Sequence, residues 1–131
     1  AALPELELTV LGPIDREPEF ERAYRRELYE TPNIRTHGWI DVASPEFQRI
    51  AHRHLALVYP SCSEGQNGGA VTCMHAGLIP MLSRESGVNL DAEYGIELVS
   101  SSLEEIRGRS FVKILEGRKA RAAAAAAAAA Q

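Results

Sequence analysis

The stretch from residue 61 to residue 69 holds the residue types best suited to binding a ligand. It reads Ser-Cys-Ser-Glu-Gly-Gln-Asn-Gly-Gly and lies between an apolar run and a short predicted helix. Its three glycines allow the backbone to turn sharply and to approach a ligand closely. Free N–H groups at the start of the helix would form an anion site. Glu64 offers two acceptor oxygens, which suit the hydroxyl groups of a sugar. Together these groups have the chemistry that a nucleotide-sugar requires, although glycine-rich loops also occur as plain turns.

Strands that alternate with helices are predicted to position this loop. Apolar or alternating runs bounded by Gly and Pro indicate strands, and the continuous apolar run at 55–60 is typical of a strand covered on both faces. Amphipathic runs between them indicate helices, and such alternation implies right-handed βαβ crossovers. The predicted fold class is therefore α/β, a Rossmann-like parallel sheet flanked by helices, with its ligand site at the carboxyl edge. The predicted strands are 5–12, 34–40, 55–60, 78–83 and 95–100, and the predicted helices are 19–30, one that Ser44 caps, 70–76, and one that Ser102 caps.

Four motifs stand in a fixed order along the chain. Residues 38–42 read Gly-Trp-Ile-Asp-Val and residues 60–65 read Pro-Ser-Cys-Ser-Glu-Gly; residues 74–80 read Met-His-Ala-Gly-Leu-Ile-Pro and residues 84–87 read Arg-Glu-Ser-Gly. The set resembles the donor-binding, C-terminal half of GT-B-fold glycosyltransferases, in particular the retaining group 1 type. In that family a Gly-containing turn lies beside the nucleobase, a Pro-Ser-x-x-Glu-Gly motif ends a strand, and a variable loop follows the next strand. The resemblance covers roughly residues 6–107.

The resemblance implies a nucleotide-sugar-binding Rossmann-like domain over residues 1–117, incomplete at its N-terminal side, and an Ala-rich helical tail over residues 118–131. The parent protein would be a hexosyltransferase-like enzyme that transfers a sugar from a nucleotide-sugar to an unknown acceptor with retention. No metal or other cofactor is required by the residues. The family's N-terminal acceptor domain would be a missing partner, so the isolated chain is expected to be inactive.

The resemblance implies a role for each residue of the site. Glu64 would be the catalytic-site carboxylate that binds the sugar hydroxyls of the donor, and the backbone of residues 65–69 would meet the sugar and the diphosphate. Thr72 stands eight residues after Glu64, where the family has a second Glu that grips the ribose. A Thr cannot accept as a charged group, so ribose binding is expected to be lost or achieved differently. The substrate-binding residues implied are Gly38 and Trp39 beside the base, with Ser63, Gly65, Gln66, Asn67, Gly68, Gly69 and Thr72.

Composition argues against several other classes of protein. The 131 residues carry 14 basic and 18 acidic side chains, with no basic block, which argues against nucleic acid as a partner. Apart from nine alanines at 122–130, which favour a helix, no apolar run approaches the length of a membrane span. Two cysteines favour reduced thiols, and without a signal peptide the expected location is cytoplasmic. The spacing of Cys62, Cys73 and His75 matches no common zinc pattern, so no metal site is predicted.

Two alternative functions remain open from the sequence. A non-catalytic nucleotide or nucleotide-sugar binding module is favoured by Thr72 and by the missing half. A receiver-like regulatory domain is the other, but no acidic cluster follows the first strand to support it. Other residues near the ligand edge also have two interpretations each. Asp15, Arg16 and Glu17 either lie in a solvated loop or join the site, and Arg84 and Glu85 either do the same or reach a phosphate or the partner domain. His37 either functions near the base or has a structural role, and Trp39 either stacks on a base or packs.

Overall fold

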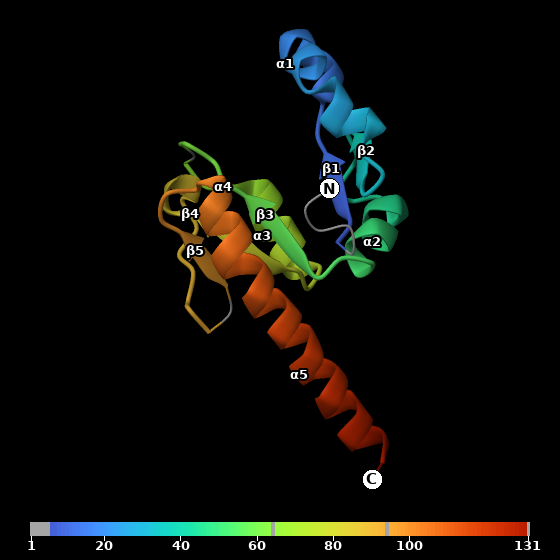
Figure 1. The fold of residues 1–131 in the computed structure, drawn as a ribbon, viewed down its shortest axis with the longest axis vertical. Helices are drawn as coiled ribbons and strands as arrows, with labels where there is room; N and C mark the ends of the chain where they lie inside the picture. The colour runs from blue at the N-terminus through green and yellow to red at the C-terminus, as the bar shows by residue number, and fades with distance from the viewer. Residues whose placement is uncertain (1–5, 64, 94, 131) are drawn as a thin grey trace. The chain divides into compact units, whose positions relative to one another are not determined.

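The computed structural model describes residues 6–63, 65–93 and 95–130, whose strands form two separate parallel sheets (Figure 1). The chain divides into two compact units, Ala1–Phe47 and Gln48–Gln131, and each unit contains one of the sheets. All five predicted strands are present, although each is shorter than the sequence pattern indicates. The predicted α/β class, with parallel strands flanked by helices, is therefore confirmed.

The first unit is built on strands β1 (Leu8–Leu11) and β2 (Ile34–Gly38), which pair in parallel. The helix predicted over 19–30 is divided, because at Tyr24 the backbone leaves the helical region with φ of −110° and ψ of 23°. The hydroxyl of Thr36 donates to the carbonyl of Leu28 at 2.7 Å, which joins the segment before β2 to the strand itself. The connection from β1 to β2 contains the 3-10 helix η1 (Ile14–Arg16), helix α1 (Pro18–Ala23) and the π-helical turn η2 (Arg26–Glu30).

Helix α2 (Pro45–His52) follows β2 and begins where the sequence indicates. The N–H of Phe47 donates to the hydroxyl of Ser44 at 3.2 Å, which is the hydrogen bond of an N-cap. The hydroxyl of Ser44 in turn donates to the carbonyl of Asp41 at 2.6 Å, so the turn before the helix is fixed as well. Phe47 and Ala51, four residues apart on one helical face, are both buried. The predicted cap at Ser44 is thus confirmed.

The second unit is built on a three-stranded parallel sheet in which β4 (Ile79–Ser83) is the central strand. Strands β3 (Ala56–Tyr59) and β5 (Ile96–Leu98) pair with β4 on either side. Met81 and Leu82 of β4 are completely buried, whereas the residues of β3 are half-buried or exposed. The prediction that the run at 55–60 is covered on both faces is therefore wrong, because the central position belongs to β4.

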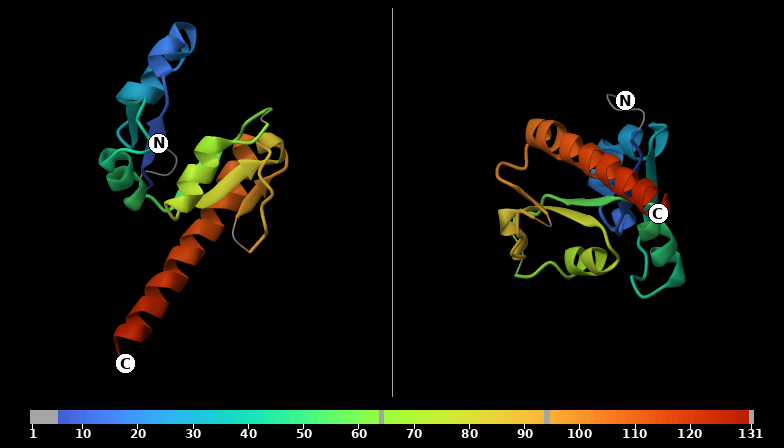
Figure 2. Two further views of the ribbon diagram at one scale, coloured as in Figure 1. Left: turned by 180° about the vertical axis from the view of Figure 1, so that it is seen from behind. Right: turned by 90° about the horizontal axis from the view of Figure 1, so that it is seen from below.

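Helices flank the sheet of the second unit. Helix α3 (Gly68–His75) lies on one side and the start of helix α5 (Phe111–Ala129) on the other, as the right-hand view of Figure 2 shows. Helix α5 continues through the alanine run, which confirms the helix predicted there. Within the described ranges, no helix combines the length and the apolar character needed to cross a membrane. The remaining short helical segments are η3 (Arg84–Ser86), α4 (Leu103–Glu105) and η4 (Ile106–Ser110).

The turn after β5 is organised by the carboxylate of Glu105. It accepts the N–H groups of Val99 at 2.7 Å, of Ser100 at 2.8 Å and of Ser101 at 2.8 Å. These hydrogen bonds favour the ionised carboxylate and lower the pKa of Glu105 below its usual value. The N–H of Glu105 donates to the hydroxyl of Ser102 at 3.1 Å, so the predicted cap at Ser102 is confirmed.

Candidate functional site

The loop that connects β3 to α3 leaves the sheet of the second unit at its carboxyl edge. Because the strands are parallel, the loop after β4 leaves the same edge. The hydroxyl of Ser83 donates to the carbonyl of Ser61, and the N–H of Asn67 donates to the carbonyl of Ser86 at 3.1 Å. The first loop is therefore hydrogen-bonded to the second near its beginning and at its end.

Gly87 is a point of very close approach between these two loops. Its φ of 70° lies in the left-handed region, where glycine is favoured. A Cβ atom at this position would lie 2.2 Å from the carbonyl oxygen of Gly65, a separation that real Cβ contacts do not show. Only a glycine therefore allows the loop after β4 to pack against Gly65. The sequence placed Gly87 in a variable loop and gave no signal for this contact, which joins residues far apart along the chain.

Asn67 is buried and caps helix α3. Its Oδ1 accepts the N–H of Ala70 at 2.9 Å, and only 4% of the residue is exposed. Its Nδ2 is also buried and has no hydrogen-bond partner among the described residues. Since the N–H of Asn67 is bonded to Ser86, this residue fixes the loop and the helix start instead of presenting its amide to a ligand.

Two N–H groups remain open at the start of α3. Gly68 and Gly69 occupy the first two positions of the helix, where an N–H has no acceptor within the helix, and both residues are exposed. Within residues 6–63, 65–93 and 95–130, neither N–H has a hydrogen-bond acceptor, whereas those of Ala70 and Val71 are bonded to Asn67. An anion at this end of α3 would meet two free donors and the positive end of the helix dipole.

Thr72 lies in the second turn of α3 and is turned back on the helix. Its hydroxyl donates to the carbonyl of Gly68 at 2.9 Å. Because that bond engages the only proton of the hydroxyl, Thr72 can offer a ligand an acceptor oxygen but no donor. Glu64, the predicted catalytic-site residue, lies outside the described residues. The other predicted loop residues, Ser63, Gly65 and Gln66, are exposed.

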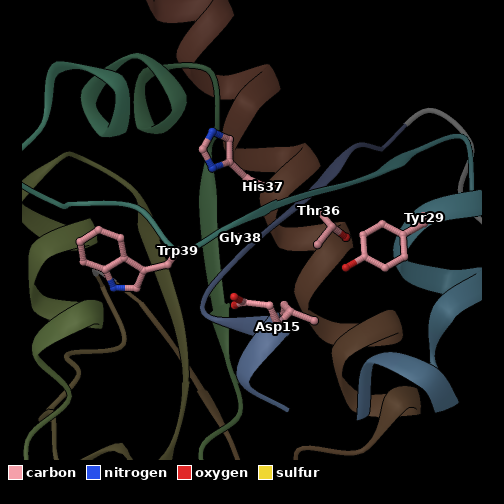
Figure 3. A pocket seen from close by; sticks show the side chains of 7 residues that line it. Asp15, Tyr29, Thr36, His37, Gly38 and Trp39 are labelled. Atoms are coloured by element: carbon pink, nitrogen blue, oxygen red, sulfur yellow. The ribbon is translucent and has the colours of Figure 1, made fainter. Parts of the chain in front are cut away.

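A pocket of about 380 Å³ lies in the first unit, where β1 and β2 end (Figure 3). Gly38, with φ of 86°, ends β2 and turns the chain so that Trp39 reaches the pocket. Both residues predicted to flank a base thus line this pocket. It adds Asp15 and His37, whose roles the sequence left open, and three residues that the sequence did not indicate. The complete lining is Ile14, Asp15, Tyr29, Thr36, His37, Gly38 and Trp39.

Three polar side chains of the pocket are already engaged by the protein. The hydroxyl of Tyr29 donates to Oε1 of Glu21 at 2.7 Å, and this hydrogen bond, with desolvation, raises the pKa of Tyr29. The hydroxyl of Thr36 donates to a backbone carbonyl of η2. Nε2 of His37 lies 3.1 Å from Oε1 of Glu46. The donors of these side chains therefore serve the structure of the unit.

Asp15 and Trp39 are the polar and aromatic pocket residues whose side chains make no hydrogen bond, ion pair or ring contact with any described residue. The carboxylate of Asp15 is exposed and makes no hydrogen bond or ion pair within the described part of the chain. In Figure 3 it points from η1 toward Trp39. Trp39 is 65% exposed and makes no aromatic or cation–π contact with any described residue. The pocket consequently presents one carboxylate and one aromatic ring that the described residues do not engage.

Side chains that could bind a metal do not gather in the described residues, where no group of three His, Cys, Asp or Glu converges. Cys62 is exposed, and Cys73 is half-buried on α3. Burial raises the pKa of the Cys73 thiol, so this thiol is protonated at neutral pH. Cys73 therefore has the properties of a packing residue.

Comparison of the chain with models of protein families, with curated proteins and with solved structures gives no significant match. The inferences about function therefore depend on the motifs, on the loop after β3 and on the pocket at the end of β2.

Proposed function

We propose that this chain is the donor-binding part of a retaining glycosyltransferase, which transfers a sugar from a nucleotide-sugar to an acceptor. The observation that carries the proposal is the pair of free N–H groups of Gly68 and Gly69, at the end of a loop that leaves the carboxyl edge of a parallel sheet. Ligands bind at this edge in open α/β sheets. The resemblance of residues 60–65 and 74–80 to the glycosyltransferase motifs supports the same assignment.

The two N–H groups suit the diphosphate of the donor. As the bond between sugar and diphosphate breaks, negative charge grows on the leaving diphosphate. Preorganised N–H donors at a helix start stabilise such charge without having to reorganise. Asn67 holds these donors in place, because it caps α3 through Ala70 and bonds to Ser86 of the neighbouring loop. In this proposal Glu64 binds the hydroxyl groups of the transferred sugar.

The pocket of the first unit suits the base of the donor. Trp39 offers an exposed aromatic face on which a base can stack. The pocket volume of about 380 Å³ falls within the range usual for small-molecule sites.

Calorimetric titration of the 131-residue chain with nucleotides and nucleotide-sugars tests the proposal. We expect a nucleotide-sugar to bind, and Glu64→Ala to weaken its binding more than that of the bare nucleoside diphosphate. Glu85→Gln, on the neighbouring loop, is the matched control for loss of an acidic side chain. No binding of any nucleotide-sugar, or equal losses for both ligands in Glu64→Ala, would contradict the assigned role.

A non-catalytic nucleotide-sugar binding module is the second candidate. The observation that favours it is Thr72, whose hydroxyl is bonded to Gly68 at the position where the resembled family has a carboxylate. The two functions differ in turnover. A protein that contains this chain together with an acceptor-binding half would hydrolyse or transfer the donor if it is an enzyme, and would only bind it if it is a module.

A further inference from the structure

We infer that the carboxylate of Asp15 selects guanine as the base of the donor, so that the substrate class is a GDP-sugar. The inference rests on the proposed function, because it assigns a base to the pocket at the end of β2. It adds a specificity-determining residue and a choice among nucleotides that neither the motifs nor the fold supplies.

Most of the polar side chains that line the pocket are already hydrogen-bonded within the protein. The hydroxyl protons of Tyr29 and Thr36 are donated to Glu21 and to the carbonyl of Leu28, at 2.7 Å in both cases. His37 is held by Glu46. The carboxylate of Asp15 makes no hydrogen bond or ion pair in the described part of this pocket, and the indole N–H of Trp39 has no hydrogen-bond acceptor there either. The edge of a ligand that faces Asp15 must therefore present hydrogen-bond donors.

The four bases differ in the hydrogen-bond donors and acceptors that they would present to a carboxylate. An ionised carboxylate only accepts, and it can accept two parallel N–H bonds. Guanine presents two adjacent donors, its ring N1–H and its exocyclic N2–H, on the edge that proteins read in unpaired nucleotides. Adenine and cytosine place a ring acceptor next to their amino group, and uracil flanks its single ring N–H with two carbonyls. With each of these three bases, one carboxylate oxygen would face an acceptor.

Trp39 and Asp15 both line the pocket and come from different segments of the first unit. Figure 3 shows the carboxylate of Asp15 pointing toward Trp39, which stands just after the end of β2. A base that stacks on the exposed indole would thus be read at its edge from the side of η1. Stacking tolerates every base, because each has a π face, whereas the carboxylate discriminates. Trp39 would therefore supply affinity for any base, and Asp15 would supply the specificity for guanine.

The ribose is the other group of a nucleotide that a carboxylate could bind. A contact with the ribose would change the nucleotide affinities in a different way from a contact with the base. A contact of Asp15 with the ribose hydroxyls would strengthen the binding of every nucleotide by the same factor. A contact with guanine would strengthen the binding of GDP alone, and this gain in affinity would depend on the exocyclic amine. Inosine diphosphate is the probe that separates these cases, because it is guanosine diphosphate without that amine.

The experiment is calorimetric titration of GDP, IDP, ADP, CDP and UDP into the wild-type chain, Asp15→Asn and Glu17→Gln. Glu17 is an exposed carboxylate that follows η1 and does not line the pocket, which makes it the matched control. We expect the wild type and Glu17→Gln to bind GDP about 10- to 100-fold more tightly than IDP or UDP, as a hydrogen bond to a charged group allows. Asp15→Asn should lose most of the advantage of GDP over IDP while its affinity for UDP stays within about twofold.

Two results would overturn the inference and leave the proposed function standing. One is a wild type that prefers UDP, CDP or ADP. The other is an Asp15→Asn variant that weakens every nucleotide by the same factor, which would place Asp15 at the ribose. If no nucleotide and no nucleotide-sugar binds, the proposed function fails together with the inference. Circular dichroism of each variant shows whether it is folded before its affinity is interpreted.

Discussion

Gly87 and Gly65 meet so closely that a single added carbon at Gly87 would lie 2.2 Å from the carbonyl oxygen of Gly65. Two further hydrogen bonds, from Ser83 to Ser61 and from Asn67 to Ser86, join the same pair of loops. The loop after β4 therefore fixes the backbone that leads to the free N–H groups at the start of α3. The site after β3 is positioned by the neighbouring loop as much as by its own residues.

Substitution of Gly87 by Ala is expected to destabilise the second unit and to weaken donor binding together. The left-handed φ of 70° and the clash with Gly65 each oppose a Cβ atom. Such backbone strain costs about 1–3 kcal/mol. Gly108→Ala is the control, because a Cβ there meets nothing within 4 Å and the φ is not positive. Chemical denaturation and titration with a nucleotide-sugar measure the two effects, and a Gly87→Ala variant as stable as Gly108→Ala would contradict the contact.

Replacement of Asn67 by Ala should destabilise the helix that carries the two free N–H groups. The variant loses the acceptor for the N–H of Ala70, and loss of an N-cap costs about 0.5–2 kcal/mol. Asn67→Ser retains a capping oxygen and removes the buried Nδ2, which has no partner among the described residues. The serine variant should therefore lie closer to the wild type in urea denaturation. Equal losses for the two variants would indicate that the cap contributes little.

The local pattern of the sequence predicted most of the fold. Ser44 and Ser102 both cap helices, and each strand contains an apolar core between Gly, Pro or polar residues. These features depend on neighbours within a few residues, which a linear pattern records. Which of the strands is the most deeply buried could not be predicted in the same way. The apolar runs at 55–60 and 78–83 look alike, and only strand order makes β4 the central one.

The sequence motifs indicated two residues that line the pocket, whereas the residues that support them left no sequence signal. Gly38 and Trp39 were expected beside a base, and both line the pocket. Tyr29 reaches the same pocket from η2, a contact set by the packing of a helical turn on β2. The contact between Gly87 and Gly65 likewise depends on the pairing of two strands. Contacts of this kind are fixed by tertiary structure and leave no periodic signal in the sequence.

The stability of the second unit should depend on the ionisation of Glu105. Its folded pKa is lowered by the N–H bonds of Val99, Ser100 and Ser101, so its ionised form stabilises the fold. That contribution is fully present above about pH 4.3, the usual pKa of a glutamate, and is lost as the pH falls through the lower folded pKa. Glu105→Gln should thus be less stable than the wild type at neutral pH, and the difference should shrink in acid. Glu104→Gln, whose side chain holds no such turn, is the control, and a difference that does not change with pH would contradict the role.

Trp39 should support the binding of every nucleotide, whereas Asp15 should matter only for guanine. Base stacking on an aromatic side chain is worth about 1–3 kcal/mol and does not depend on hydrogen-bond pattern. Trp39→Ala is therefore expected to weaken GDP, IDP and UDP by similar factors, while Tyr24→Ala, which removes another exposed aromatic ring, leaves them unchanged. Trp39 is the one tryptophan of the chain, so nucleotide-dependent quenching of its fluorescence reports the contact directly. Binding by calorimetry without any change in fluorescence would place the base away from Trp39, and the specificity assigned to Asp15 would then lose its geometric support.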